Sequence, residues 1–156
     1  MNRTFSDSIV IAAPADTLYD MVSDITRMGE WSPICRAGWW DEGQGPAVGS
    51  WFTGRNETPE RIWETRSLVE QASPGEVFSF VVGGDRTRWT YHFDEVEGGT
   101  RVTETWEFLP GGEESFRERF GPDADAQISA RELAAKQGIP DTLRALKDVA
   151  EKEAGR

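Results

Sequence analysis

A carboxylate interrupts an otherwise apolar row in the segment RVTETWEF, residues 101–108. Successive side chains of a strand point to opposite faces, so Val102, Glu104, Trp106 and Phe108 share one face. The opposite face of the same segment holds only polar side chains, so the row with Glu104 is expected to face the core. A carboxylate buried among rings loses several kcal/mol of solvation. It must therefore be paired, protonated or in contact with water in a cavity.

Two interpretations of Glu104 follow from this position. In the first, it bonds a neighbouring hydroxyl or an arginine and only fixes the strand. In the second, it is the polar anchor of a ligand cavity, where it accepts a hydrogen bond from a ligand hydroxyl or donates one when protonated. Desolvation raises the pKa of a carboxyl and a nearby arginine lowers it, so the direction of the shift reports the environment. Tyr91 is the other inward residue that could donate or accept a proton.

Other residues with catalytic or metal-binding chemistry give weaker signals. One His and one Cys cannot form a zinc site from His/Cys clusters. His92 falls on the outward positions of its strand and is expected to be solvated, and Cys35 is expected to be a small buried side chain. The carboxylates at turns or outward positions are Glu57, Glu60, Glu64 and Glu70. These positions do not predict a metal site. No cofactor is predicted either, and nucleotide binding has no support because neither G-x-G-x-x-G spacing nor a P-loop is present.

Length and charge limit the class of protein. The 156 residues predict a single domain, residues 1–156. The formal charge of −11 disfavours nucleic acid and anionic membrane surfaces as partners, because both would repel the chain. No apolar stretch approaches the ~20 residues of a membrane span, and the first ten residues lack a signal-peptide core, so membrane insertion is not predicted. With a single cysteine, a cytoplasmic location is expected.

The hydrophobic pattern predicts a strand, two short helices, six further strands and a long helix. The first strand is predicted over 4–13, and the next helix opens at Pro14. The later strands, separated by turns rich in Gly and Pro, are predicted at residues 35–41, 48–57, 61–72, 76–82, 86–97 and 100–109. Residues 123–154 predict the long helix, with a kink or break at Gly138 and Pro140. The segment GGEESFRER that precedes it is predicted to be a solvated loop.

Successive strands with short connections form an antiparallel sheet, and only the terminal helix is large enough to cover its apolar face. The inward positions of these strands are dominated by aromatic rings. If Gly98-Gly99 forms the last hairpin turn, Phe93 lies opposite Glu104. The same register places Tyr91 opposite Trp106. This pairing surrounds Glu104 with rings.

Several segments resemble those of a known family. They are SIVIAAPADTLYDMVSDITRMGEWSP, VGSWFTGRN, RTRWTYHF, GGTRVTETWEF and GIPDTLRALKDVAEKE. Together they are similar to the START-like (SRPBCC) superfamily, and most of all to its bacterial polyketide cyclase/dehydrase-type members. The resemblance runs from about Ser8 to Glu153. Members of this superfamily bind lipids, sterols, plant hormones or polyketides, and a minority catalyse cyclisation or dehydration.

The resemblance implies the helix-grip fold. In this α+β fold, a curved seven-stranded antiparallel sheet wraps around a long C-terminal helix, and two short helices follow the first strand. A ligand cavity lies between the sheet and the helix in this fold. The resemblance therefore implies a cavity more strongly than it implies a reaction. Alternating rings often simply fill a core. In this fold, however, the same face borders the cavity, and a volume of roughly 300–1,000 Å³ is expected.

Two functions remain open on these grounds. The first is binding of a small, largely apolar molecule that is lipid-like, aromatic or polyketide-like. The alternative is a polyketide cyclase or dehydratase of the aromatase type that uses Glu104 and Tyr91. The residues predicted to contact the ligand are Phe52, Trp63, Thr65, Phe80, Trp89, Tyr91, Glu104, Trp106 and Leu143.

Overall fold

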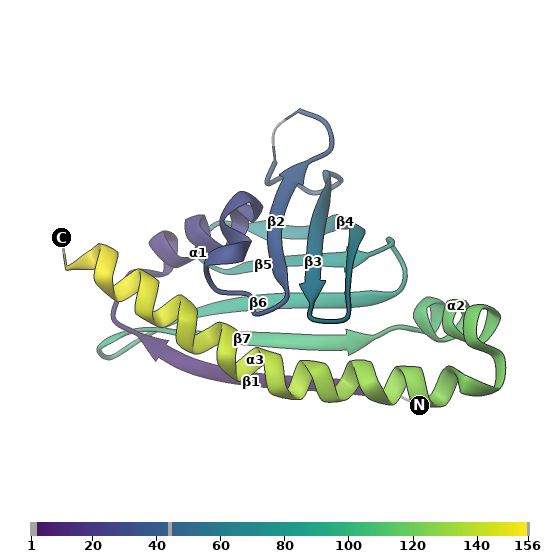
Figure 1. Ribbon diagram of the computed structural model, residues 1–156. Helices are drawn as coiled ribbons and strands as arrows, with labels where there is room; N and C mark the ends of the chain where they lie inside the picture. The colour runs from purple at the N-terminus through teal and green to yellow at the C-terminus, as the bar shows by residue number, and fades with distance from the viewer. Residues whose placement is uncertain (1–2, 44, 156) are drawn as a thin grey trace.

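Seven strands pair in an antiparallel sheet in the computed structural model, which describes residues 3–43 and 45–155. The strands are β1 (Arg3–Ile11), β2 (Cys35–Trp40), β3 (Trp51–Thr58), β4 (Arg61–Ser73), β5 (Val77–Val82), β6 (Thr87–Val96) and β7 (Gly99–Phe108). Their order across the sheet is β1-β7-β6-β5-β4-β3-β2, so every neighbouring pair except β1 and β7 is joined by a direct connection. The sheet curves, and β2 to β4 run across the direction of β6 and β7 (Figure 1).

A long C-terminal helix lies along the concave side of this sheet (Figure 1). The helices are α1 (Ala15–Ser23), the 3₁₀ helix η1 (Ile25–Glu30), α2 (Pro110–Phe120), the short 3₁₀ helix η2 (Gly121–Asp123) and α3 (Ala124–Ala154). The 31 residues of α3 give it a length of about 46 Å, enough to cross the whole sheet. The α+β helix-grip architecture expected from the sequence is confirmed. None of the described helices is both long and apolar enough to cross a membrane.

Helix α3 continues through Pro140, so the break considered at this point does not occur. A proline inside a helix removes one backbone hydrogen bond and crowds the preceding turn. Ile139 and Leu143, on either side of it, are each 1% exposed and belong to the main core. Burial of these side chains against the sheet holds the helix in place despite the lost bond.

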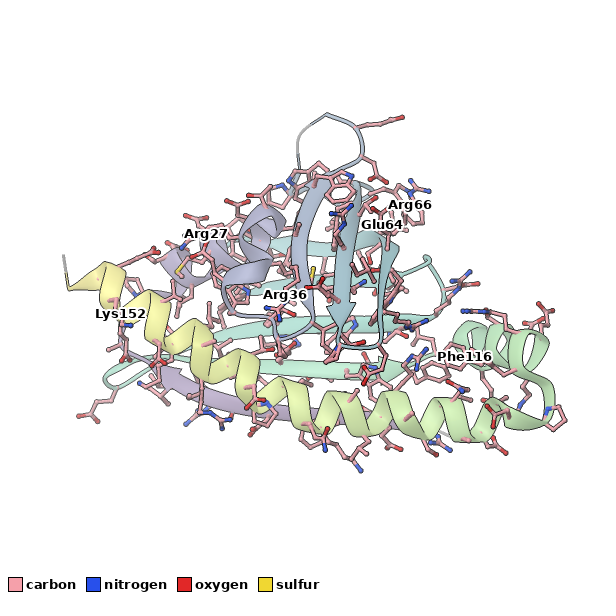
Figure 2. The ribbon with its side chains drawn as sticks, in the orientation of Figure 1. Arg27, Arg36, Glu64, Arg66, Phe116 and Lys152 are labelled. Atoms are coloured by element: carbon pink, nitrogen blue, oxygen red, sulfur yellow. The ribbon has the colours of Figure 1, made fainter. Side chains whose placement is uncertain are left out.

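The segment after β7 corrects a second expectation. It was predicted to be a loop, but Pro110–Phe120 forms α2. Proline is tolerated in a first helical turn, where its missing N–H has no partner to lose. Phe116 is buried between α2 and the sheet, with its ring centroid 5.2 Å from that of Phe108, and Figure 2 shows it on the inner side of the helix. Two glycines and many charged residues make this segment look like a loop in the sequence. Packing of Phe116 against its apolar neighbours stabilises the helix.

The hairpin between β6 and β7 differs from the turn predicted from the sequence. The predicted turn was Gly98-Gly99, whereas the turn in the structure falls one residue earlier, at Glu97-Gly98. As a result, Glu104 lies opposite Tyr91 instead of Phe93. Two successive glycines give the sequence two possible places for a tight turn, and both glycines adopt positive φ in the structure. The error is two residues of register, which leaves every side chain on its predicted face.

Helix η1 packs against β2 so closely that β2 requires a glycine at the contact. A Cβ atom added to Gly38 would lie 2.6 Å from the carbonyl oxygen of Ile25. Gly138, in the interior of α3, is different: a Cβ there would meet only the Pro33 side chain, at 3.9 Å. The two glycines therefore have different reasons to be present.

Alanine substitutions test this difference. Gly38→Ala should lower the free energy of unfolding by roughly 1–3 kcal/mol, because backbone must move to admit the methyl group. Gly138→Ala should raise it by roughly 0.5–1 kcal/mol, because alanine loses less entropy in a helix. Urea unfolding of both variants measures the two changes. Equal effects at the two sites would show that η1 does not pack on β2 as described.

Candidate functional site

A cavity of about 480 Å³ lies between the concave face of the sheet and α3. Its volume falls within the range expected for a small-molecule site. Strands β3 to β7 supply the aromatic wall, because their inward positions alternate with solvent-facing ones. On the helix side, small side chains face the same space, including Ala134, Ala135 and Gly138. Large rings on one wall and small residues on the other leave the interior unfilled.

Eight of the nine residues predicted to contact a ligand line this cavity. They are Phe52, Trp63, Thr65, Phe80, Trp89, Tyr91, Glu104 and Trp106. Leu143 lies elsewhere, in the main core, where it is 1% exposed. Ile139 and Thr142 line the cavity from α3 in its place. One residue corresponds to about 100° of helical rotation, so a small error in the helix orientation moved Leu143 out of the predicted wall.

Glu104 and Tyr91 form a buried pair in the cavity wall. They are directly opposite each other on β7 and β6. The Tyr91 hydroxyl donates a hydrogen bond of 2.9 Å to Oε2 of Glu104. The carboxyl is 3% exposed, and its Oε1 atom has no hydrogen-bond partner within the described part of the chain. Of the partners considered for Glu104, a hydroxyl rather than an arginine is present.

Burial controls the protonation of this pair. It raises the pKa of Glu104 to about 8, although the hydrogen bond from Tyr91 acts in the opposite direction. Burial, followed by the Glu104 charge, also raises the pKa of Tyr91 well above its usual value. The carboxyl is therefore mostly protonated at neutral pH. With Oε2 accepting the bond from the Tyr91 hydroxyl, Oε1 is the carboxyl oxygen left without a partner among the described residues.

Cys35 and His92 do not form a catalytic pair. Cys35 also lines the cavity, but its thiol donates to the carbonyl oxygen of Ala37 at 3.4 Å. Burial raises the pKa of this thiol, which keeps it protonated and weakly nucleophilic. His92 is exposed on the other face of the sheet. His92 is exposed as the alternation predicted, and Cys35 is buried as expected.

The carboxylates that the sequence predicts at turns or outward positions are on the surface. Glu57, Glu60, Glu64 and Glu70 are all exposed, and Glu70 pairs with Arg88 at 2.7 Å. In residues 3–43 and 45–155, no three His, Cys, Asp or Glu side chains come together in a way that could hold a metal ion.

Four arginines at the cavity were missed by the sequence analysis. The residues are Arg61, Arg86, Arg119 and Arg131, and all of them line the cavity. Arg61 could have been found, because it precedes Trp63 by two residues on the same face of β4. Arg119 and Arg131 could not, since they reach the cavity only through α2 and its packing on α3.

Known proteins place the chain in a family. The family described as "Polyketide cyclase / dehydrase and lipid transport" matches residues 2–151. The chain also resembles a polyketide-cyclase-like protein of Corynebacterium glutamicum, with 50% identity over 99% of this chain and 94% of that chain and a TM-score of 0.73. No curated protein matches the chain. The chain therefore belongs to the polyketide cyclase / dehydrase and lipid transport family, and the resemblance to START-like (SRPBCC) proteins is confirmed.

Two more distant structures share the fold. One is the di-domain ARO/CYC protein StfQ from the steffimycin biosynthetic pathway, with 18% identity, a TM-score of 0.74, and coverage of 100% of this chain and 53% of that chain. The other is the di-domain ARO/CYC protein BexL from the BE-7585A biosynthetic pathway, with 19% identity, a TM-score of 0.67, and coverage of 96% and 50%. The present chain thus spans about half of each di-domain protein.

The raised pKa of Glu104 predicts a pH-dependent stability that Glu104→Gln removes. In the unfolded chain this carboxyl ionises near its usual value of 4.5, whereas in the fold it ionises near 8. Wild-type protein should therefore lose roughly 3 to 5 kcal/mol relative to Glu104→Gln as the pH rises from about 4.5 to 8. The two proteins should be similar at pH 4.5. Urea unfolding across this range makes the measurement.

Tyr91→Phe provides the matched test of the hydrogen bond. Because the Tyr91 hydroxyl lowers the Glu104 pKa, its removal should move the inflection to a pH above 8. Wild-type and Glu104→Gln curves that run parallel from pH 4.5 to 9 would show that Glu104 is not desolvated.

Proposed function

We propose that this protein binds a small, largely apolar molecule in the cavity, and that Glu104 contacts a polar group of that molecule. The observation that supports this most is the Oε1 atom of Glu104. It is buried and has no hydrogen-bond partner among the described residues, and it belongs to a residue that lines the cavity. Nearly all buried polar atoms in folded proteins have a hydrogen-bond partner. A hydroxyl or carbonyl oxygen of a bound molecule would supply one.

The remainder of the wall favours an apolar body for this molecule. Rings from five strands surround the space, and the polar side chains of the lining stand between and beside them. One of these, the Thr65 hydroxyl, already accepts a hydrogen bond of 3.2 Å from Asn56. A mostly apolar wall with a few placed polar groups is the usual composition of a small-molecule site. The family description, which covers both cyclases and lipid transport, supports lipid-like or polyketide-like molecules.

A cavity-filling variant tests the binding site. N-phenyl-1-naphthylamine, a neutral apolar dye that fluoresces when it leaves water, is the probe. Ala134→Trp should raise the Kd for the dye at least tenfold, because Ala134 lines the cavity and the indole would occupy it. Ala130→Trp places the same ring on the exposed surface of α3 and should leave the Kd unchanged. Equal affinities in the two variants would mean that the dye binds outside the cavity.

A second candidate function is supported by the same pair of residues. A carboxyl with a pKa of about 8 exists in both protonation states near neutral pH, as proton transfer requires. Ionised Glu104 could take the α-proton of a β-hydroxy ketone. The same proton could then be delivered to the leaving hydroxyl, which departs as water while the carbon–carbon double bond forms.

This activity is testable with 4-hydroxy-4-phenylbutan-2-one, whose dehydration gives an ultraviolet-absorbing enone. In a dehydratase, kcat/KM should rise with pH up to about 8, and Glu104→Gln should abolish turnover. Tyr91→Phe should move the pH midpoint upward. Glu104→Gln with unchanged turnover would exclude this carboxyl as the base and leave the binding function as the proposal.

A further inference from the structure

The cavity is bordered by arginines that form no ion pair with the acidic residues that the structure describes. The chain has 28 acidic and 17 basic residues, so a gathering of several unpaired arginines at one place is unexpected. Within the described residues, none of the four arginines at the cavity has a carboxylate within ion-pairing distance. We call these four residues the arginine cluster: Arg61, Arg86, Arg119 and Arg131. The cluster is a local exception in an acidic protein.

The arginine cluster is assembled from separate elements at one end of the cavity. Arg61 is the first residue of β4, and Arg86 immediately precedes β6. Arg119 comes from α2 and Arg131 from α3. Helix α2 follows the end of β7, which lies beside the start of β6 (Figure 1). These positions define the cavity mouth.

Aromatic rings support three of these guanidinium groups. Arg61 lies over the ring of Trp63, 4.1 Å from its centroid, and Arg131 lies 5.4 Å from the centroid of Phe116. Arg119 is placed in the same way on the ring next to it in α2. Contact with a ring face holds a guanidinium in place. It leaves the N–H donors at the edge of the group available for an acceptor.

Two members of the cluster, Arg61 and Arg119, act on the charge of a third, Arg131. Burial, and then the charges of Arg61 and Arg119, lower the pKa of Arg131 from its ordinary value. Glu64 is the one carboxylate besides Glu104 that borders the cavity among the described residues. It occupies the alternate face of β4 together with Arg66, opposite to Arg61 and Trp63. Like charges held together without a counterion are relieved by an anion that binds between them.

We propose that the molecule bound in the cavity carries an anionic group, a carboxylate or a phosphate, that the arginine cluster binds at the cavity mouth. This inference rests on the proposed binding function and specifies the class of ligand. Guanidinium groups match both anions through paired N–H donors. The apolar body of the molecule then extends along the rings toward Glu104.

The register of β6 gives the length of such a molecule. Tyr91, the partner of Glu104, is five residues from Arg86, which immediately precedes β6. Five residues of strand span about 17 Å. An elongated molecule with its charge at one end can contact both the arginine cluster and Glu104. A compact or uncharged molecule cannot make both contacts.

Competition for the dye with three chains of equal length tests the proposal. The competitors are dodecanoate, dodecyl phosphate and dodecanol, each displacing N-phenyl-1-naphthylamine. At least one of the anions should compete at a concentration at least tenfold lower than dodecanol, and the better anion identifies the carboxylate or the phosphate as the preferred group. The double variant Arg119→Gln/Arg131→Gln should lose this preference and bind dodecanol as the wild type does.

A matched control separates the cluster from the loss of net charge. Arg55 and Arg101 are exposed, without an ion-pair partner among the described residues, and outside the cavity lining. Arg55→Gln/Arg101→Gln removes the same two charges and should keep the full preference for the anion. A control variant that loses the preference equally would overturn the proposal.

The remaining outcomes distinguish the two levels of the hypothesis. If all three chains compete equally and the cluster variant changes nothing, the cavity binds apolar molecules and the anionic class is wrong. If the dye itself does not bind in the cavity, the proposed binding function fails first. Phosphatidylglycerol vesicles that bind the wild type but not the cluster variant, without any anion preference in the competition, would assign the cluster to a membrane surface and overturn the proposal.

Discussion

Packing of α3 against the concave side of the sheet is the constraint on which the rest of the structure depends. The helix is fixed at both ends by apolar contacts. Toward its C-terminus, Leu143 and Leu146 enter the main core, and toward its N-terminus, Ile128 packs with Phe116 of α2. Between these contacts the helix presents small side chains to the sheet. The helix is therefore held firmly while a space remains beneath its middle.

This space has a different chemistry at each end. The inner end holds the Glu104 carboxyl, which burial keeps neutral, and which can donate or accept a hydrogen bond. The outer end holds the arginine cluster, three of whose guanidinium groups lie on aromatic rings. Aromatic side chains connect the two ends, and the ring of Trp106 lies 6.0 Å from that of Phe108. A molecule inside would meet an apolar passage with a distinct polar group at either end.

The same features explain why the site accommodates a buried acid at all. Glu104 retains one hydrogen bond, from Tyr91, and its other oxygen has no partner among the described residues. An ionised carboxylate in this position would lack the solvation and the cation that it needs. Along the wall, Arg86 at the mouth is five residues of strand away from Tyr91, the partner of Glu104. The fold therefore keeps the carboxyl protonated by separating it from the arginines.

The sequence determined the parts of this protein that depend on periodicity. Alternation along a strand has a period of two, so it placed Glu104, Tyr91 and Trp106 on one inward face. Even the wrong hairpin turn preserved that assignment, because the register moved by two residues. Succession of strands with short connections likewise determined the antiparallel sheet and the helix that covers it.

Only the tertiary structure decided which residues meet across the elements. The hydroxyl partner of Glu104 depended on the register, and the place of Leu143 depended on the rotation of α3. Helix α2 exists because Phe116 finds an apolar surface, although its own segment is rich in charges and glycine. The arginine cluster depends in turn on α2. These contacts join residues distant in sequence, and local propensity carries no information about them.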